Sequence, residues 1–97
     1  NLDAVARLKA GHSVKIRPHG GSMRGRIESG QEVTLSPVKP EELVVDDVVL
    51  VRWKGNFLLH LIKEINGDQI LIGNNIDKEN GWVTSRDVFG KVTEVND

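Results

Sequence analysis

The hydrophobic pattern at the low-numbered end of the chain predicts a short helix and then a strand. Apolar residues in the stretch 2–10 recur at near-helical spacing, and Gly11 follows where helices commonly end on a residue with positive φ. Val14–Arg17 alternates apolar and basic residues, which is typical of a half-buried strand. Pro18 ends this strand because proline cannot donate a ladder hydrogen bond.

The longest apolar runs lie in the middle of the chain. A strand is predicted at 32–35, and prolines mark an exposed connection after it. β-Branched residues on both sides of Asp46–Asp47 predict a tight turn followed by a central strand over 48–53. Lys54–Asn56 has the composition of a hairpin turn, after which 57–65 returns as another long strand.

The remaining pattern completes a meander of strands. Asn66–Asp68 is a strong turn signal before a strand at 69–72. A polar loop is predicted over 73–81, followed by closing strands at 82–84 and 88–92. Short strands separated by turns, with one small helix, predict a mainly β, barrel-like domain.

Composition narrows the class of protein. The length of 97 residues, with 38% hydrophobic and 28% charged content, predicts a single domain over 1–97. The net charge of -1 lacks the basic excess that drives binding to phosphate backbones, so no direct nucleic-acid binding is expected. The absence of cysteine excludes disulfides, thiolate zinc sites and a thiol nucleophile, and it favours a cytoplasmic location.

No membrane-spanning segment is predicted. A spanning helix needs about 18 or more consecutive apolar residues, and no run in the chain approaches that length. The chain opens on Asn1, which is compatible with a domain excised from a longer protein. Association with a membrane would then require a segment that is absent from this chain.

Ser22 is the first candidate for chemistry. It follows Gly20–Gly21, and glycines permit unusual backbone angles and close approach by another backbone. A glycine pair before serine is also common in ordinary surface turns. Ser22 therefore becomes a candidate nucleophile only in combination with a base elsewhere in the chain.

His60 is the second candidate, because it is the one polar interruption in the apolar run Phe57–Ile62. A buried imidazole needs hydrogen-bond partners, so a structural histidine and a catalytic base both fit this position. Lys63 is the rival base, and in a regular strand its parity would turn it to the opposite face.

The other polar and aromatic candidates have simpler interpretations. His12 and His19 lie in polar, turn-like surroundings and are expected to be exposed, and with His60 they lack the spacing of a metal site. Three arginines near Ser22 are expected to form a solvated basic rim: Arg17, Arg24 and Arg26. The two tryptophans are expected to pack in the core or at an interface.

The order of these segments resembles the signal peptidase I and LexA-type repressor superfamily of serine peptidases. Nearly the whole chain takes part, through stretches that resemble the superfamily's Gly-x-Ser-Met box, its Gly-Asp-Val-Val strand start, its base-bearing strand and its closing boxes: Gly20–Met23, Asp46–Val51, Leu59–Ile62, Gly73–Asn75 and Ser85–Val92. The resemblance implies a mainly β fold, namely a small coiled, partly open β-barrel with one short N-terminal helix.

Within this superfamily the chain is most similar to the branch whose base is histidine rather than lysine. The resemblance implies that Ser22 is the nucleophile and that His60 accepts its proton. Asp77 is implied as the acid that orients the imidazole, and Asp87 is the other option. No cofactor and no metal are implied.

The implied function is hydrolysis of a peptide bond in an extended peptide or protein substrate, with the rate falling in acid as His60 is protonated. A second interpretation stays open, in which the chain is a catalytically inactive relative that serves as the dimerisation or sensing domain of a phage-type repressor. Both interpretations leave a homodimer open.

Overall fold

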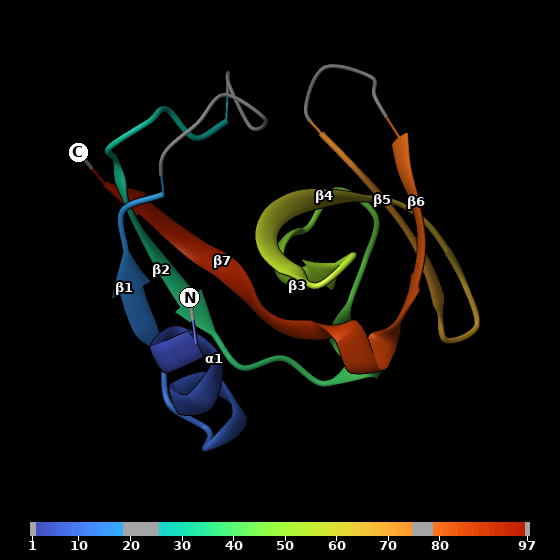
Figure 1. Cartoon of the computed structure of the whole chain (residues 1–97), viewed down its shortest axis with the longest axis horizontal. Helices are drawn as coiled ribbons and strands as arrows, with labels where there is room; N and C mark the ends of the chain where they lie inside the picture. Colours follow the sequence, from blue (N-terminus) through green and yellow to red (C-terminus); the bar gives the residue numbers. More distant parts are fainter. Residues whose placement is uncertain (1, 19–25, 75–78, 97) are drawn as a thin grey trace.

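The chain folds into one curled antiparallel sheet with a short helix packed against it (Figure 1). The computed structural model describes residues 2–18, 26–74 and 79–96. The described residues form these elements: α1 (Leu2–Lys9), β1 (Val14–Ile16), β2 (Glu32–Ser36), η1 (Pro40–Glu42), β3 (Val48–Trp53), β4 (Asn56–Asn66), β5 (Gln69–Gly73), β6 (Glu79–Thr84), η2 (Ser85–Asp87) and β7 (Val88–Asn96). The predicted class, mainly β with one short α-helix, is confirmed.

β7 connects the pair β1–β2 to the strands β3–β6 within the sheet. The strand order is β1-β2-β7-β3-β4-β5-β6, so the last strand in the sequence lies between β2 and β3. The register shifts within the pairings β2–β7, β3–β7, β4–β5 and β5–β6. Bulges of this kind bend strands, which fits the strong curvature of β4 in Figure 1. Among the described strands β1 pairs only with β2 and β6 only with β5, so these pairings do not close the sheet on itself.

β3 and β4 are covered by apolar side chains on both faces. Val49 and Ile62 pack on one face with residues of β5 and β6. Leu50 and Leu61 point to the other face, where they pack with α1, β1 and β2. Burial on both faces explains why these two strands are nearly continuous apolar runs instead of alternating ones.

α1 ends in a Schellman motif. Gly11 has a φ of +92° and donates its N–H to the Leu8 carbonyl oxygen at 3.0 Å, and His12 donates to the Arg7 carbonyl oxygen at 3.0 Å. These bonds satisfy carbonyl groups that the end of a helix leaves without a partner. The predicted stop at Gly11 is confirmed.

The sequence prediction of a loop was wrong for Gly73 and for residues 79–81. Gly73 belongs to β5, residues 79–81 belong to β6, and β7 extends beyond the predicted 88–92 to Asn96. Gly81 is required by packing, because a Cβ at this position would lie 2.5 Å from the Trp53 ring. A glycine that makes room for a neighbouring ring has the same sequence signature as a glycine in a turn.

The helices in the described part of the chain were compared with the requirements for a membrane span. None of them is both long enough and apolar enough to cross a bilayer.

Replacing Gly90 with alanine is expected to destabilise the fold, because α1 packs directly on this residue of β7. A Cβ at Gly90 would lie 2.9 Å from Leu8 Cδ2 and 2.9 Å from the Ser36 carbonyl oxygen. We expect Gly90→Ala to lower the free energy of unfolding by about 2–3 kcal/mol in urea denaturation.

Gly67→Ala is the matched control, because Gly67 has a φ of +63° and no atom within 4 Å of an added Cβ. It should cost about 1 kcal/mol through backbone strain alone. A cost at Gly90 no larger than the cost at Gly67 would contradict close packing of α1 on β7.

Candidate functional site

His60 is buried in the middle of β4. Its residue surface is 6% exposed, and among the described residues it is the only polar or charged one that is buried. The strand register places it opposite Val49 of β3 and on the same face as Ile62. A histidine inside an apolar strand is therefore confirmed, and it needs a hydrogen-bond partner.

The backbone supplies that partner. His60 Nδ1 lies within hydrogen-bonding distance of the Leu59 carbonyl oxygen. Because a carbonyl oxygen only accepts, this contact suits the tautomer that carries its proton on Nδ1 and its lone pair on Nε2. This is the tautomer that a general base needs, because proton acceptance requires a lone pair.

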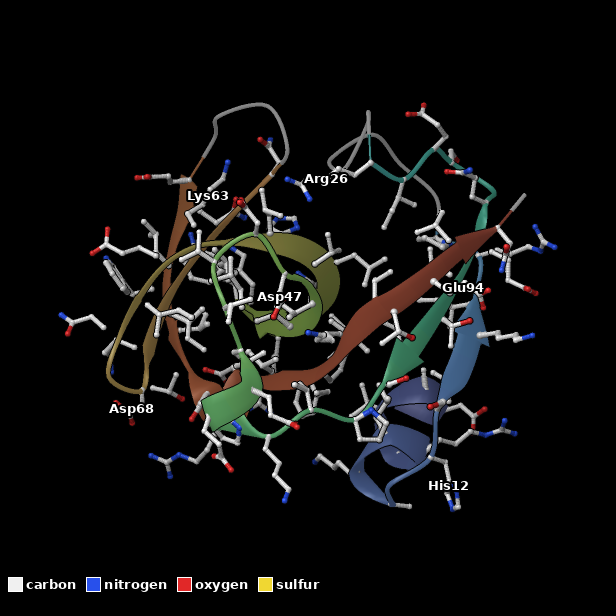
Figure 2. All side chains as sticks on the ribbon, turned by 180° about the vertical axis from the view of Figure 1, so that it is seen from behind. His12, Arg26, Asp47, Lys63, Asp68 and Glu94 are labelled. Atoms are coloured by element: carbon white, nitrogen blue, oxygen red, sulfur yellow. The ribbon has the colours of Figure 1, made fainter. Side chains whose placement is uncertain are left out.

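Lys63 lies at a bulge in β4. The register of β4 with β5 shifts between Ile62 and Glu64, so Lys63 is the extra residue of the bulge. The parity argument for a regular strand does not apply at a bulge. In Figure 2, Lys63 lies toward the same end of the molecule as Arg26.

Lys91 of β7 is a second lysine to compare with His60. It lies opposite Val49, which lies opposite His60, so the three residues share one face across adjacent strands. The ammonium Nζ of Lys91 lies 3.4 Å from Asp47 Oδ1. The ammonium form of lysine has no lone pair with which to accept a proton.

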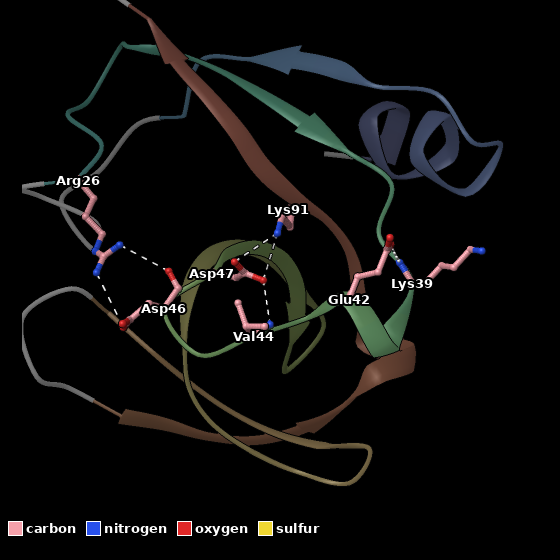
Figure 3. A network of polar contacts seen from close by, with 7 residues as sticks. All are labelled: Arg26, Lys39, Glu42, Val44, Asp46, Asp47 and Lys91. Atoms are coloured by element: carbon pink, nitrogen blue, oxygen red, sulfur yellow. Dashed lines mark hydrogen bonds and ion pairs between the residues drawn. The ribbon is translucent and has the colours of Figure 1, made fainter.

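Asp46 and Asp47 form a bulged turn at the start of β3 (Figure 3). Asp47 donates its N–H to the Val44 carbonyl oxygen at 3.1 Å, and Asp46 has a φ of +80°. Ile62 of β4 faces both aspartates: its carbonyl oxygen accepts from Asp46 N–H, and its N–H donates to the Asp47 carbonyl oxygen, each at 2.9 Å. This is the pattern of a G1 bulge, in which the residue with positive φ is usually glycine.

The Asp47 carboxylate connects this bulge to β7. Its Oδ2 accepts the Val44 N–H at 3.0 Å, while Lys91 lies against Oδ1. Side-chain exposure is 14% for Asp47 and 32% for Lys91, so solvent screens this ion pair less than a pair on the open surface. Asp47 therefore fixes the start of β3 to both its own turn and a neighbouring strand (Figure 3).

Ser22, the predicted nucleophile, lies outside the described residues, as do His19, Met23 and Arg24. The described residues on the two sides of this stretch are hydrogen-bonded to each other. Gly30 donates its N–H to the Pro18 carbonyl oxygen at 3.0 Å, and Arg17 Nη1 donates to the Gly30 carbonyl oxygen at 2.8 Å.

Arg26 and Ile27 connect the same stretch to the strand that carries His60. Ile27 is 4% exposed and belongs to an apolar cluster with Leu61, the residue after His60. Arg26 contacts the Asp46 turn, with Nη2 3.9 Å from the carboxylate and Nη1 3.5 Å from the carbonyl oxygen. Arg26 and Ile27 are thus held next to the start of β3 and the cluster that contains Leu61.

Asp77, the predicted orienting acid, also lies outside the described residues. β5 ends at Gly73, which pairs with Leu61, and Asn74 follows. Strand pairing therefore places Gly73, at the end of β5, opposite Leu61, the residue after His60.

Asp87, the other option for the orienting acid, has both carboxylate oxygens engaged elsewhere. Oδ1 lies 3.1 Å from Arg52 Nη2, and Oδ2 accepts the Thr84 N–H at 3.2 Å. Arg52 lies at the end of β3 remote from Val49, the partner of His60. Asp87 does not orient His60 in this structure.

The remaining candidates lie outside this arrangement. His12 is exposed, as predicted, and lies at the opposite end of the molecule from Arg26 (Figure 2). Trp53 packs against the core, whereas Trp82 is 45% exposed and is not a core residue. No group of three or more metal-ligating side chains is found in the described part of the chain.

Sequence reasoning missed three features of the site: the bulge at Asp46, the ion pair between Asp47 and Lys91, and the burial of Ile27. The first had a signal, because the box that 46–51 resembles carries glycine where Asp46 stands. Ile27 also had one, since it is the lone apolar residue between Arg24 and Gln31. The Asp47–Lys91 ion pair had none, because it depends on β7 lying beside β3.

Substitutions at Asp46 test the strain in the bulge. We expect Asp46→Gly to be more stable than Asp46→Ala by about 1 kcal/mol, because glycine adopts positive φ without a Cβ penalty. Both variants lose the exposed contact with Arg26, so that loss cancels in the comparison. Urea denaturation of the two variants measures the difference, and equal stability would contradict a strained Asp46.

Comparison with known proteins assigns no family to the chain. No family model, no curated protein and no solved structure matches it. The candidate site therefore depends on the chain's own residues: the buried His60, the bulge at Asp46–Asp47 and the apolar cluster that contains Ile27 and Leu61.

Proposed function

We propose that the chain is a serine endopeptidase domain in which Ser22 is the nucleophile and His60 is the general base. The observation that supports this proposal most directly is the state of His60. It is buried in an apolar strand, and its Nδ1 lies within hydrogen-bonding distance of a backbone carbonyl oxygen, which suits the tautomer with its lone pair on Nε2. The proposed architecture is the partly open, coiled barrel of the LexA and signal peptidase type.

The proposed reaction proceeds through an acyl-enzyme. As Ser22 Oγ attacks the carbonyl carbon of the scissile peptide bond, its proton passes to His60 Nε2. The imidazolium then gives this proton to the leaving amine, and the C–N bond breaks. His60 then takes a proton from a water molecule as the water oxygen attacks the ester carbonyl carbon. The bond from that carbon to Ser22 Oγ breaks, the imidazolium returns the proton to Oγ, and the acid product leaves.

Asp77 is the proposed orienting acid, in a smaller role than that of the acid in a Ser-His-Asp triad. In such a triad the acid holds the imidazole in the correct tautomer and orientation. Here the Leu59 carbonyl oxygen already accepts the Nδ1–H. What remains for Asp77 is to stabilise the imidazolium that forms during the reaction.

The proposed substrate is an extended peptide or protein segment. Main-chain hydrogen bonds to a strand would give affinity, and shallow pockets near Ser22 would favour small residues. The proposal needs no cofactor and no metal ion, since each proton transfer uses His60.

Labelling with a fluorophosphonate tests the dyad directly. We expect the wild type to be labelled, Ser22→Ala to be unlabelled, and His60→Gln to be labelled about 10³-fold more slowly. Because a protonated imidazole accepts no proton, the wild-type rate of labelling should fall in acid. Asp77→Asn should lose less than about tenfold, because a backbone carbonyl oxygen already holds Nδ1–H.

The matched controls are Ser29→Ala and His12→Gln, which change exposed residues of the same types. Both should be labelled at the wild-type rate. Equal labelling of Ser22→Ala and wild type would rule out Ser22 as the nucleophile. A folded, dimeric chain that is never labelled would instead support the inactive dimerisation or sensing domain of a phage-type repressor.

A further inference from the structure

β6 lies at one end of the sheet, and its outer edge has few of the features that protect an edge strand. Among the described strands it pairs only with β5 (Figure 1). β1, at the other end, has three residues, carries the exposed Lys15 and is followed by Pro18. Short length, lysine and proline discourage pairing with another chain. β6 has six residues and contains neither lysine nor proline, so its edge is the more open of the two.

The register of β6 with β5 determines which backbone groups of β6 point outward. Ser85 donates its N–H to the Asp68 carbonyl oxygen at 3.0 Å, which continues the register of the two strands. In an antiparallel ladder, residues that are hydrogen-bonded to the neighbouring strand alternate with residues whose N–H and C=O groups point away from it. Ser85 and Val83 therefore face β5, and the backbone groups of Trp82 and Thr84 point to the outer edge.

Only part of this outer edge is open. The Thr84 N–H donates to Asp87 Oδ2 at 3.2 Å, and Asp87 Oδ1 lies 3.1 Å from Arg52 Nη2. Near the start of β6 the register with β5 shifts, so a bulge interrupts the edge there. On the outer side of Trp82, neither the N–H nor the C=O has a hydrogen-bond partner among the described residues. Trp82 is therefore the residue of β6 at which another strand can bind.

The Trp82 side chain is exposed beside these backbone groups. Trp82 is 45% exposed, and it lies opposite Leu71 of β5, on the face away from the buried Val83. Tryptophan is enriched at protein interfaces, because its ring covers a large area and its N–H can reach a polar partner. One residue thus offers a strand partner both hydrogen bonds and an apolar surface.

The charges at the two ends of β6 favour a second copy of this chain as the partner. Glu79 begins the strand and Arg86 follows it; both are exposed, and neither has an ion pair in the described part of the chain. If two β6 strands pair antiparallel with Trp82 opposite Trp82, Glu79 of each copy comes near Arg86 of the other. Because the net charge is only -1, repulsion between the copies is small.

We propose that two copies of the chain pair antiparallel through their β6 edges, with Trp82 at the two-fold axis. This proposal does not rest on the proposed function. Each Trp82 N–H donates to the carbonyl oxygen of the other Trp82, and the two rings lie side by side on one face of the joined sheets. The bulge and the bond at Thr84 limit the pairing to the middle of the strand. The interface is therefore small, and the dimer is weak and reversible.

Sedimentation equilibrium from about 10 μM to about 1 mM measures the dimer. We expect the wild type to dimerise in this range, and Trp82→Thr and Trp82→Pro each to raise the Kd at least about tenfold. Proline removes the outward N–H but no bond to β5, so the strand tolerates it. Val95→Thr is the matched control, because Val95 is a 37% exposed residue of β7, and its Kd should be unchanged. Urea denaturation checks that every variant is folded.

Charge reversal tests the antiparallel arrangement of two identical strands. Glu79→Arg and Arg86→Glu each bring like charges together at two symmetric positions, so each should raise the Kd about fivefold at low ionic strength. An equimolar mixture of the two single variants should recover the wild-type Kd, because opposite charges then meet at both positions. The double variant should recover it for the same reason.

Each outcome supports or overturns the dimer. Weaker association of both Trp82 variants, with recovery in the mixture of charge variants, supports it. A chain that stays monomeric, Trp82 variants that dimerise like the wild type, or charge variants that do not recover on mixing would overturn it. A loss in Val95→Thr alone would place the contact at β7 instead. Fluorophosphonate labelling of Ser22 tests the peptidase proposal separately, so either proposal can fail without the other.

Discussion

Burial of β3 and β4 on both faces is the constraint on which the rest of the structure depends. A strand that is apolar on both sides needs cover on both sides, and α1 with β2 covers one face while β5 and β6 cover the other. β7 makes this possible by lying between β2 and β3, so that one sheet curls around both sides of the central strands. His60 lies inside this arrangement, and a polar ring there must find its hydrogen bond in the backbone.

Most of the fold could be predicted from the sequence, because the elements follow local rules. The central strand over 48–53 agrees with the structure residue for residue, and Gly11 ends α1 as expected. The failures were at Gly73, at residues 79–81 and beyond 92, where the pattern alone was ambiguous. Polar residues on an edge strand have the composition of a loop. Gly81 has the sequence signature of a turn, because the residue that requires glycine there, Trp53, is distant in the sequence.

The candidate site could be predicted only in part. The burial of His60 followed from its apolar neighbours, and its tautomer followed only from the position of the Leu59 carbonyl oxygen. Lys63 shows the limit of parity arguments, because a single inserted residue changes which way later side chains point. Partners separated widely in sequence, such as Asp47 and Lys91, depend on the position of β7 and have no local signal.

The ion pair between Asp47 and Lys91 also bears on why a histidine suits this face of the sheet. Lys91 shares the face with His60 but is held by a carboxylate that simultaneously caps the turn at Val44. Freeing its amine to act as a base would break the ion pair and remove charge from a contact that secures the start of β3. An imidazole avoids this conflict, because it is neutral near pH 7 in ordinary surroundings and its second nitrogen can be satisfied by a carbonyl oxygen. In the proposed site, Lys91 stabilises the start of β3 through Asp47, and His60 is the base.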